Sequence, residues 1–246
     1  MKINAEEFTS GQILLIDKPL HWSSFQAVNK IKWALKKNLG LKKIKVGHAG
    51  TLDPLATGLL IVCTGKSTKQ ISELQGQIKE YTGTFHLGST TPSYDLETEI
   101  NETFATDHIT AELLETARQT FLGEIDQRPP VFSALKKDGK RLYEHARKGE
   151  EVEIPTRKVT IHEFELTRVA LPEINFRVVC SKGTYIRSLA FDFGQAVASG
   201  AHLSALRRTK IGDYSVDNAI DVEHFEQNFI QVDNKVHTSE STLSEN

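Results

Sequence analysis

Apolar residues in short unbroken or alternating runs predict several β-strands along the chain. The run 59–63 has the length and β-branched content of a buried strand, and residues 12–16 form a similar, shorter run. Apolar and polar positions alternate over residues 78–87, which predicts that Tyr81 and Phe85 share one face of a strand. Further strands are predicted over residues 157–168, 173–181 and 202–216.

Apolar residues at helical spacing predict helices between these strands. The first helix has Ser23 or Ser24 as its N-cap and ends at Gly40. Its predicted buried face consists of Phe25, Val28, Ile31 and Leu35. Longer helices are also predicted over residues 110–122 and from Gly183 to Gly200, and shorter ones over residues 141–148 and 221–229.

The length and composition fit one large globular domain, because 246 residues with 39% hydrophobic content can fill a core. No apolar stretch approaches the roughly 18 residues of a membrane-spanning helix, and the first twenty residues do not resemble a signal peptide, so we expect a cytoplasmic protein. Cys63 and Cys180 lie inside apolar runs, which favours buried, reduced thiols. The histidines lack ligand spacing, so no metal is expected.

The charges are unevenly distributed along the chain. The net charge of −2 argues against a polyanionic partner, but residues 213–246 hold eight acids and one lysine, which leaves residues 1–212 with a balance of +5. Residues 127–148 contain seven basic and two acidic residues, with Phe132 and Tyr143 among them. A second basic cluster comprises Lys36, Lys37, Lys42, Lys43 and Lys45. Such clusters are typical both of nucleic-acid contacts and of solvated surfaces.

One acidic residue, Asp53, stands in a glycine-rich loop just before the buried run 59–63. Pro54 biases Asp53 away from helical conformation, and three glycines permit conformations and close approaches that a Cβ would block. These glycines are Gly47, Gly50 and Gly58. Such a loop can hold one carboxylate in a fixed direction, although an Asp-Pro pair taken alone more often simply starts a turn.

The loop sequence Gly-His-Ala-Gly-Thr-Leu-Asp-Pro-Leu-Ala-Thr-Gly-Leu-Leu, residues 47–60, resembles the catalytic-aspartate motif of the TruB family of tRNA pseudouridine synthases. Other segments resemble the same family in the same order. They are residues 14–19, 79–81, 133–136, 180–189, 200–202 and 206–208. Residues 90–95, Thr-Thr-Pro-Ser-Tyr-Asp, depart from the Thr-Asp-Thr-x-Asp segment that the family tends to carry there.

The resemblance implies an α+β fold with a mixed, largely antiparallel sheet and flanking helices. It implies a catalytic domain over residues 1–230 that contains a basic, RNA-gripping insertion at residues 127–155. The RNA-binding side chains expected in this insertion are Lys136, Lys137, Lys140 and Arg141. Residues 231–246 are polar and are predicted to form a disordered tail. The family's usual C-terminal RNA-binding module is expected to be lacking.

The resemblance also implies a reaction, the isomerisation of uridine to pseudouridine at position 55 in the T-loop of tRNA. Asp53 is the implied catalytic residue, and Arg187 is expected beside it, although an arginine next to an apolar helical stripe is ordinarily a solvated surface residue. The expected substrate contacts are His48 in the place vacated by the flipped base, Tyr81 and Tyr185 against the uracil, and the backbone around Leu206 at its edge. No cofactor is expected, and the predicted protein is a monomer that binds the tRNA T-arm without a protein partner.

Two other functions are compatible with parts of the sequence. A glycoside hydrolase also uses a carboxylate at C1′ but generally needs a pair of acids, whereas the loop supplies only Asp53. A non-catalytic RNA-binding protein or tRNA-folding chaperone needs the basic insertion and would not depend on Asp53. For an enzyme, the sequence leaves open whether Asp53 attacks C1′, attacks C6 of the base, or removes the 2′ hydrogen.

Overall fold

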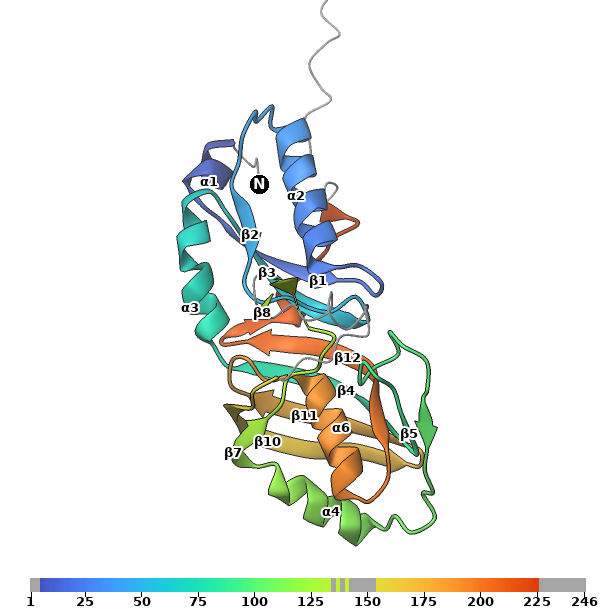
Figure 1. Ribbon diagram of the computed structural model, residues 1–246. Coiled ribbons are helices and arrows are strands. Elements are labelled where there is room, and N and C mark those ends of the chain that lie inside the picture. The colour runs from blue at the N-terminus through green and yellow to red at the C-terminus, as the bar shows by residue number, and fades with distance from the viewer. Residues whose placement is uncertain (1–4, 134–135, 138–139, 142–153, 226–246) are drawn as a thin grey trace, which may run out of the picture.

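The computed structural model describes residues 5–133, 136–137, 140–141 and 154–225 (Figure 1). The helices are α1 (Ala5–Ser10), α2 (Ser24–Asn38), α3 (Ile71–Gly76), α4 (Ala111–Thr120) and α6 (Ile186–Ala196), with 3-10 turns η1 (Gly65–Gln70) and η2 (Val216–Asn218). The strands of the main sheet are β1 (Ile13–Lys18), β2 (Val46–His48), β3 (Ala56–Thr64), β4 (Lys79–Leu87), β7 (Gly123–Gln127), β10 (Arg157–Ala170), β11 (Glu173–Cys180), β12 (Ala201–Ile211), β13 (Tyr214–Ser215) and β14 (Ile220–Asp221). Two short hairpins pair β5 (Ser89–Thr90) with β6 (Glu102–Thr103) and β8 (Lys136–Lys137) with β9 (Lys140–Arg141).

Within the described residues, ten strands form one sheet in the order β14-β1-β3-β12-β4-β11-β10-β7, with β2 added to β3 and β13 to β12. The pairs β1–β14 and β3–β12 are parallel, and the remaining pairs of this sheet are antiparallel. The α+β class with a mixed, largely antiparallel sheet is therefore confirmed.

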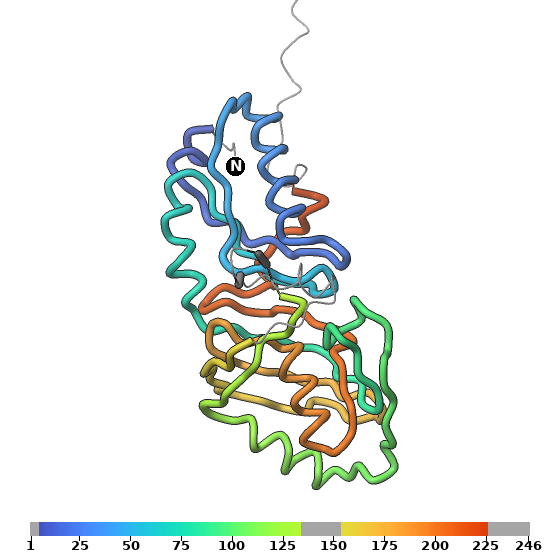
Figure 2. The backbone as a smooth tube through the Cα atoms, viewed as in Figure 1, coloured from blue at the N-terminus to red at the C-terminus, as the bar shows by residue number. Residues whose placement is uncertain are grey.

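Strand β12 joins the two halves of the sheet, because it lies between β3 and β4 although it follows them far along the chain (Figure 2). Its Arg208 stands opposite Gly58 of β3. Gly58 has φ +100°, and a Cβ there would lie 2.3 Å from the Arg208 carbonyl oxygen. Glycine is therefore required where the end of the Asp53 loop meets β12.

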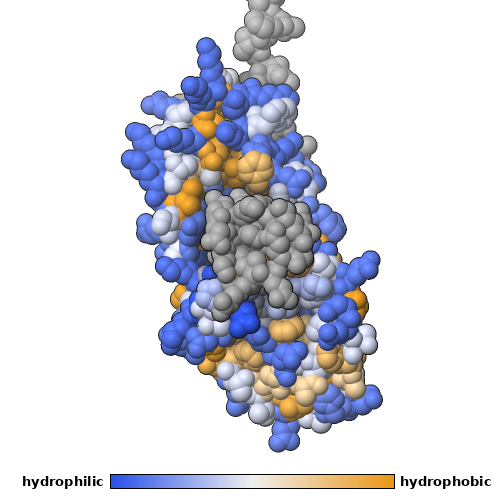
Figure 3. Space-filling view, viewed as in Figure 1, coloured by the Kyte–Doolittle hydropathy of each residue, from blue (hydrophilic) through white to orange (hydrophobic). Residues whose placement is uncertain are grey.

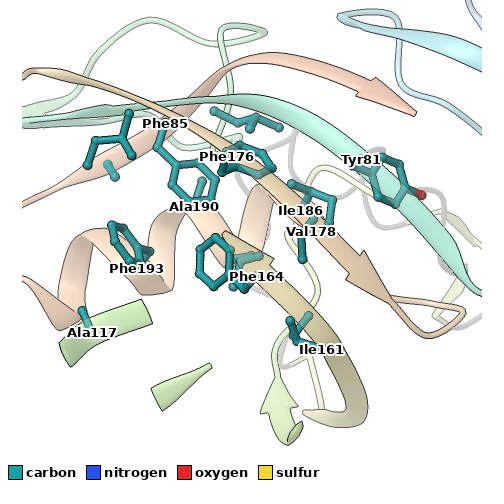
Figure 4. Packing of buried hydrophobic residues seen from close by; sticks show 14 of the residues in the cluster. Tyr81, Phe85, Ala117, Ile161, Phe164, Phe176, Val178, Ile186, Ala190 and Phe193 are labelled. Atoms are coloured by element: carbon teal, nitrogen blue, oxygen red, sulfur yellow. The ribbon is translucent and has the colours of Figure 1, made fainter. Parts of the chain in front are cut away.

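One face of β4, β11 and β10 packs against α6 through an aromatic cluster (Figure 4). Phe85 stacks on Phe176 with ring centroids 4.2 Å apart, and the ring of Phe193 from α6 lies 5.5 Å from that of Phe85. Tyr81 lies on the same face of β4, as the alternating pattern predicts, and its hydroxyl points away from the phenylalanines (Figure 4). The cluster thus positions Tyr81 at the edge of the core.

Helix α2 packs on the other half of the sheet, against Leu60 and Val62 of β3. Its predicted capping is confirmed, because Ser23 and Gln26 form a capping box. Val28, Ile31 and Leu35 are buried as predicted, together with Ser24, Ala27 and Ala34. The prediction for Phe25 is wrong, since its side chain is 69% exposed. Ser24 and Ala27 take the buried positions of the first turn and leave Phe25 on the outer side.

The remaining element predictions are largely confirmed. Residues 157–168, 173–181 and 202–216 correspond to β10, β11 and the pair β12 and β13, and the helix predicted over 110–122 is α4 with Thr110 as its N-cap. The predicted helix 221–229 is wrong at its start, because Asp221 belongs to β14 and pairs with β1. Val222 and Phe225 enter the core with a helix-like spacing, which explains the misassignment.

Several predictions concern residues outside the described ranges. These are the rest of that helix, the tail 231–246, and residues 142–148 of the short helix in the insertion, whereas Arg141 itself lies in β9. No helix in the described part of the chain is long and apolar enough to cross a membrane.

Candidate active site

The loop that carries Asp53 is fastened on both sides of this residue. The Ser24 hydroxyl at the start of α2 donates to the Leu52 carbonyl oxygen at 3.0 Å and accepts from the Leu52 amide at 2.8 Å. On the other side, the His21 amide donates to the Pro54 carbonyl oxygen at 2.8 Å. The Asp53 side chain remains 40% exposed. The loop therefore holds one carboxylate in a fixed position at a surface open to solvent.

Arg187 is buried and oriented toward Asp53. Its side chain is 4% exposed, and its Nη2 lies 2.9 Å from Asp53 Oδ2. The guanidinium also donates to the carbonyl oxygens of Ser93 at 3.1 Å and Phe132 at 2.9 Å. Four separate segments thus meet at this arginine, whose planar group fixes the direction of the carboxylate.

A second carboxylate, that of Asp95, lies on the far side of the same guanidinium. Asp95 Oδ2 is 3.5 Å from Arg187 Nε, and the Asp95 side chain is 5% exposed. The segment is tied to β12, because the Leu203 amide donates to the Tyr94 carbonyl oxygen at 2.9 Å. Arg187 is therefore held between one buried and one solvent-facing carboxylate.

A cavity of about 600 Å³ opens beside Asp53 and Arg187, within the size range of sites that bind small molecules or single nucleosides. Its lining combines these two residues with Tyr81, Tyr185 and Leu206, and with cationic side chains. The cations are Lys79, Arg157, Lys158, Lys182 and Arg208. Hydrophilic side chains predominate on the face of the molecule shown in Figure 3, with smaller hydrophobic areas near α2 and α4. The cavity suits an anionic substrate with one flat group.

Tyr81 and Arg208 stand opposite each other on β4 and β12 and form the floor of the cavity. Arg208 is 2% exposed, and its guanidinium donates to the carbonyl oxygens of Leu59 and Gly50 at 2.8 and 3.0 Å. Burial raises the pKa of Tyr81, and the Arg208 charge opposes this rise. The Tyr81 hydroxyl is therefore protonated at neutral pH.

Tyr185 lines the cavity from the N-cap position of α6. The fully buried Gln127 clamps its backbone, accepting from the Tyr185 amide at 2.7 Å and donating to its carbonyl oxygen at 3.0 Å. The Arg157 guanidinium lies over the Tyr185 ring, 4.6 Å from its centroid, and also donates to the Gly183 carbonyl oxygen. Tyr185 is thus held by contacts from β7 and β10.

His48 does not line this cavity. It lies in β2, opposite Val62 of β3, and its pKa is lowered by burial and by the charge of Arg208. The four basic residues predicted to bind RNA lie in the hairpin β8–β9 of the insertion. In this hairpin Lys136 pairs with Arg141, and Lys137 pairs with Lys140. Of the predicted site residues, the structure therefore brings Asp53, Arg187, Tyr81, Tyr185 and Leu206 together around the cavity.

Two lysines near the site are buried. Lys18 donates to the carbonyl oxygens of Pro19 and Trp22, and Lys79 donates to those of Gln75 and Gln77. Burial lowers the pKa of each to about 8, with the Arg208 charge acting in the same direction. Nearby Asp53 opposes this shift at Lys18. The region therefore holds more buried cations than buried acids.

Four groups near the site were not predicted as site residues from the sequence, namely Lys18, Lys79, Asp95 and Arg208. Lys18, Lys79 and Arg208 lie inside segments that carry the family resemblance, which was a usable signal. Asp95 lies in the segment 90–95, where Pro92 and Ser93 depart from the family's Thr-Asp-Thr-x-Asp pattern. Thr91 and Asp95 still match its first and last positions, so the final aspartate of the pattern was the available signal. Within the described residues, no group of three or more His, Cys, Asp or Glu side chains is arranged to hold a metal ion.

The fold and the site together define an enzyme-like centre with one solvent-facing carboxylate, a buried orienting arginine, two tyrosines and a cationic rim. Two family models match the chain. TruB family pseudouridylate synthase (N terminal domain) matches residues 36–186, and tRNA pseudouridylate synthase B C-terminal domain matches residues 187–245. The chain therefore belongs to the TruB family of pseudouridylate synthases, which are isomerases of RNA uridine.

The boundary between the two family models falls inside α6, between Ile186 and Arg187. Both models therefore contribute residues to the cavity, and the boundary separates no structural units. The second match also extends over residues that were expected to form the tail. The lack of the family's usual C-terminal RNA-binding module stays a prediction.

Individual proteins resemble the chain over most of its length. The tRNA pseudouridine synthase B of Flavobacterium johnsoniae is 72% identical over 223 residues, which cover 90% of this chain and 97% of that protein. The protein of the same name from Phocaeicola vulgatus is 59% identical over 218 residues, covering 89% and 93%. A chain in the crystal structure of a Cbf5-Nop10-Gar1 complex matches with a TM-score of 0.65 and 28% identity over 92% of this chain, which spans 58% of that chain.

Proposed function

We propose that the protein isomerises uridine to pseudouridine at position 55 in the T-loop of tRNA, with Asp53 as its catalytic residue. One observation carries the assignment of the residue: Asp53 presents a carboxylate that is open to solvent and ion-paired to the buried Arg187, at the edge of a cavity lined by two tyrosines. The names of the two relatives described above support tRNA as the substrate.

The reaction breaks the N1–C1′ bond, turns the uracil within the site and joins C5 to C1′, so no atom enters or leaves. An ionised carboxylate at C1′, at C6 or at the 2′ hydrogen can initiate it, as a nucleophile or as a base. All three routes need a fixed direction of approach, which Arg187 provides through its contact with Asp53 Oδ2. The geometry is compatible with each of them.

The target uridine is stacked in folded RNA and must be flipped into the cavity, at a cost of a few kcal/mol that contacts to the base offset. Tyr81 and Tyr185 supply flat apolar surfaces for the uracil, and the backbone near Leu206 contacts its edge. Tyr81 could stack against the uracil or take up the C5 proton. Burial raises the pKa of Tyr81, so the phenolate needed to take up this proton is rarely populated at neutral pH, and we assign Tyr81 the stacking role. His48, outside the cavity, occupies the place that the base leaves in the RNA.

The basic insertion holds the RNA near the cavity. Lys136, Lys137, Lys140 and Arg141 lie on a two-stranded hairpin, and their positive charges favour contact with RNA phosphates. Catalysis requires no cofactor in this proposal. The protein acts as a monomer in the cytoplasm, with residues 1–230 as its catalytic domain.

The alternatives fit the site less well. A glycoside hydrolase needs two acids that flank the scissile bond, but the second carboxylate near Asp53 is that of Asp95, which is buried against Arg187. A non-catalytic tRNA-folding chaperone leaves unexplained why a solvent-facing carboxylate is oriented by a buried arginine.

The test is to incubate the protein with an unmodified tRNA transcript and to map pseudouridine by carbodiimide treatment and primer extension. With the wild type we expect a primer-extension stop one nucleotide 3′ of position 55, and with Asp53→Asn no such stop. The variant should still bind the tRNA, because affinity comes from phosphate contacts. Asp213→Asn, at an exposed turn, is the matched control and should be fully active. Product formation by Asp53→Asn in a single-turnover assay would refute the role of Asp53.

A further inference from the structure

A lysine-rich face of helix α2 has no part in the site described above. Residues 18–52 contain eight lysines and no aspartate or glutamate. On α2 the outer side, opposite the apolar residues that pack on β1 and β3, carries exposed cationic and aromatic side chains. These are Phe25, Lys32, Trp33, Lys36 and Lys37, which we call the α2 face. Exposed Lys42, Lys43 and Lys45 follow in the connection to β2.

The α2 face combines uncompensated charge with exposed aromatic rings. Lys32, Lys36 and Lys37 form no ion pair with any residue that the structure describes. Trp33 is 50% exposed, and the ammonium groups of Lys37 and Lys30 lie 4.6 and 5.4 Å from its ring centroid. Clustered lysines beside exposed aromatic rings are typical of surfaces that bind the backbone and bases of nucleic acids.

The position of α2 relates this face to the active site. The helix starts at Ser24, whose hydroxyl is bonded to Leu52 of the Asp53 loop, so α2 runs away from the edge of the cavity. At 1.5 Å per residue, Lys36 lies roughly 18 Å farther along the helix axis than Ser24. Along the axis of a B-form duplex, the phosphate charges of one strand recur about every 3.4 Å. Lys36 is therefore several nucleotide steps farther along the helix axis than the Asp53 loop at the edge of the cavity.

We propose that the α2 face is a second RNA-binding surface, which contacts the sugar-phosphate backbone of the substrate tRNA outside its T-arm. The inference rests on the proposed function, because that function places the T-loop at Asp53. A folded tRNA brings its other strands close to the T-loop, and a polyanion matches an acid-free lysine cluster. The contact adds affinity and orientation for whole tRNA and takes no part in the chemistry.

The experiment compares two RNAs and two pairs of substitutions. Lys32→Gln with Lys36→Gln removes two charges from the α2 face, and Lys66→Gln with Lys69→Gln removes two exposed charges from η1 as the matched control. Binding of whole tRNA and of an isolated T-arm hairpin is measured over a range of salt concentrations. We expect the α2 variant to bind whole tRNA roughly tenfold more weakly, with a log–log salt slope smaller by about 1.5. Its hairpin binding and its single-turnover rate at saturating protein remain unchanged.

Equal weakening for hairpin and tRNA would overturn the proposal, as would an unchanged salt slope. Retention of full tRNA affinity together with a loss of binding to vesicles of anionic phospholipid would assign the face to a membrane surface instead. A failure of the proposed function is seen separately, because the wild type would then form no pseudouridine in either RNA while the binding comparison still stands. Neutralising Lys136, Lys137, Lys140 and Arg141 is the positive reference and weakens the binding of both RNAs.

Discussion

Arg187 and Arg177 each lie between carboxylates, but in opposite surroundings. Arg187 is almost completely buried between Asp53 and Asp95 and also donates to two backbone carbonyl oxygens. Arg177 projects from the face of β11 that is turned away from α6. Its side chain is 31% exposed and lies 2.8 Å from Glu80 and 2.7 Å from Glu163. The Glu163 side chain is 57% exposed. Similar ion pairs thus occur in a desolvated and in a hydrated environment.

The difference shows why the number of ion pairs says little about their importance. At Arg177 both the guanidinium and the Glu163 carboxylate are accessible to water, which competes with their contact, so its net contribution is small. The Arg187 and Asp95 side chains are both almost completely buried, so removing the arginine would leave the Asp95 carboxylate buried without an opposite charge. One arginine therefore holds segments from distant parts of the chain in register around Asp53, while the other ties together side chains on a sheet surface.

The largest effect is expected from Arg187→Ala. It should lower the single-turnover rate of isomerisation by roughly a hundredfold or more, because Asp53 loses its fixed direction. It should also lower the free energy of unfolding by about 3–5 kcal/mol, since the buried Asp95 carboxylate loses the opposite charge beside it. Urea unfolding and single-turnover kinetics measure the two effects. Arg187→Lys should restore part of the stability and little of the rate, because an ammonium group lacks the planar fork. Wild-type turnover in Arg187→Lys would show that guanidinium geometry is not required.

A smaller loss of rate and stability is expected from Asp95→Asn. This substitution tests the contribution of Asp95 while the contact between Arg187 and Asp53 stays in place. In the wild type the backbone N–H of Glu97 donates to Asp95 Oδ1 at 3.0 Å, and the asparagine side chain keeps an oxygen that can accept this hydrogen bond. The substitution removes the negative charge that faces Arg187 Nε. We expect a destabilisation of about 1–3 kcal/mol and a rate lowered by roughly tenfold with unchanged tRNA affinity. An unaltered rate would mean that Asp53 and the backbone oxygens alone position Arg187.

Because of the two lysines that are buried near the cavity, we expect the stability of the protein to depend on pH. The folded-state pKa of Lys79 is about 8 because of burial, whereas the unfolded chain keeps the ordinary value of 10.5. Between these values the unfolded state binds more protons, so the free energy of unfolding should rise with pH from about 8 to 10. Lys18 acts in the same direction. Lys79→Met should reduce this slope, measured by urea unfolding at several pH values, and Lys66→Met should not. A slope that is identical in Lys79→Met and wild type would contradict the shifted pKa of Lys79.

The smallest effect is expected from Arg177→Ala, on the hydrated side of the comparison. Hydrogen bonds from Thr209 and Arg177 lower the pKa of Glu80 although burial acts to raise it, and the Thr209 contact survives the substitution. The free energy of unfolding should fall by about 1 kcal/mol or less, and isomerisation should be unchanged. If Arg177→Ala lowered the free energy of unfolding nearly as much as Arg187→Ala, both arginines would be important for stability. The exposed and the buried arginine would then not differ as we infer.

Local patterns in the sequence determined most of the elements and one part of the site. The alternation around Tyr81 and Phe85 assigned these side chains to one face of β4, since a strand turns successive side chains to opposite sides whatever surrounds it. The glycines and Pro54 likewise constrain the Asp53 loop through their own backbone preferences. Such features depend on neighbours in the chain, so they are visible before folding is considered.

Only the tertiary structure decided which charged side chains are buried and which of them meet. Arg187 lies beside the apolar stripe of α6, a position that local pattern assigns to the surface, yet segments around Asp53, Ser93 and Phe132 close over it. Phe25 shows the reverse case, an apolar residue that no partner covers. Burial of a charge depends on whether distant segments supply its opposite charge and its hydrogen bonds, and helical or strand periodicity carries no information about segments on the other side of the sheet.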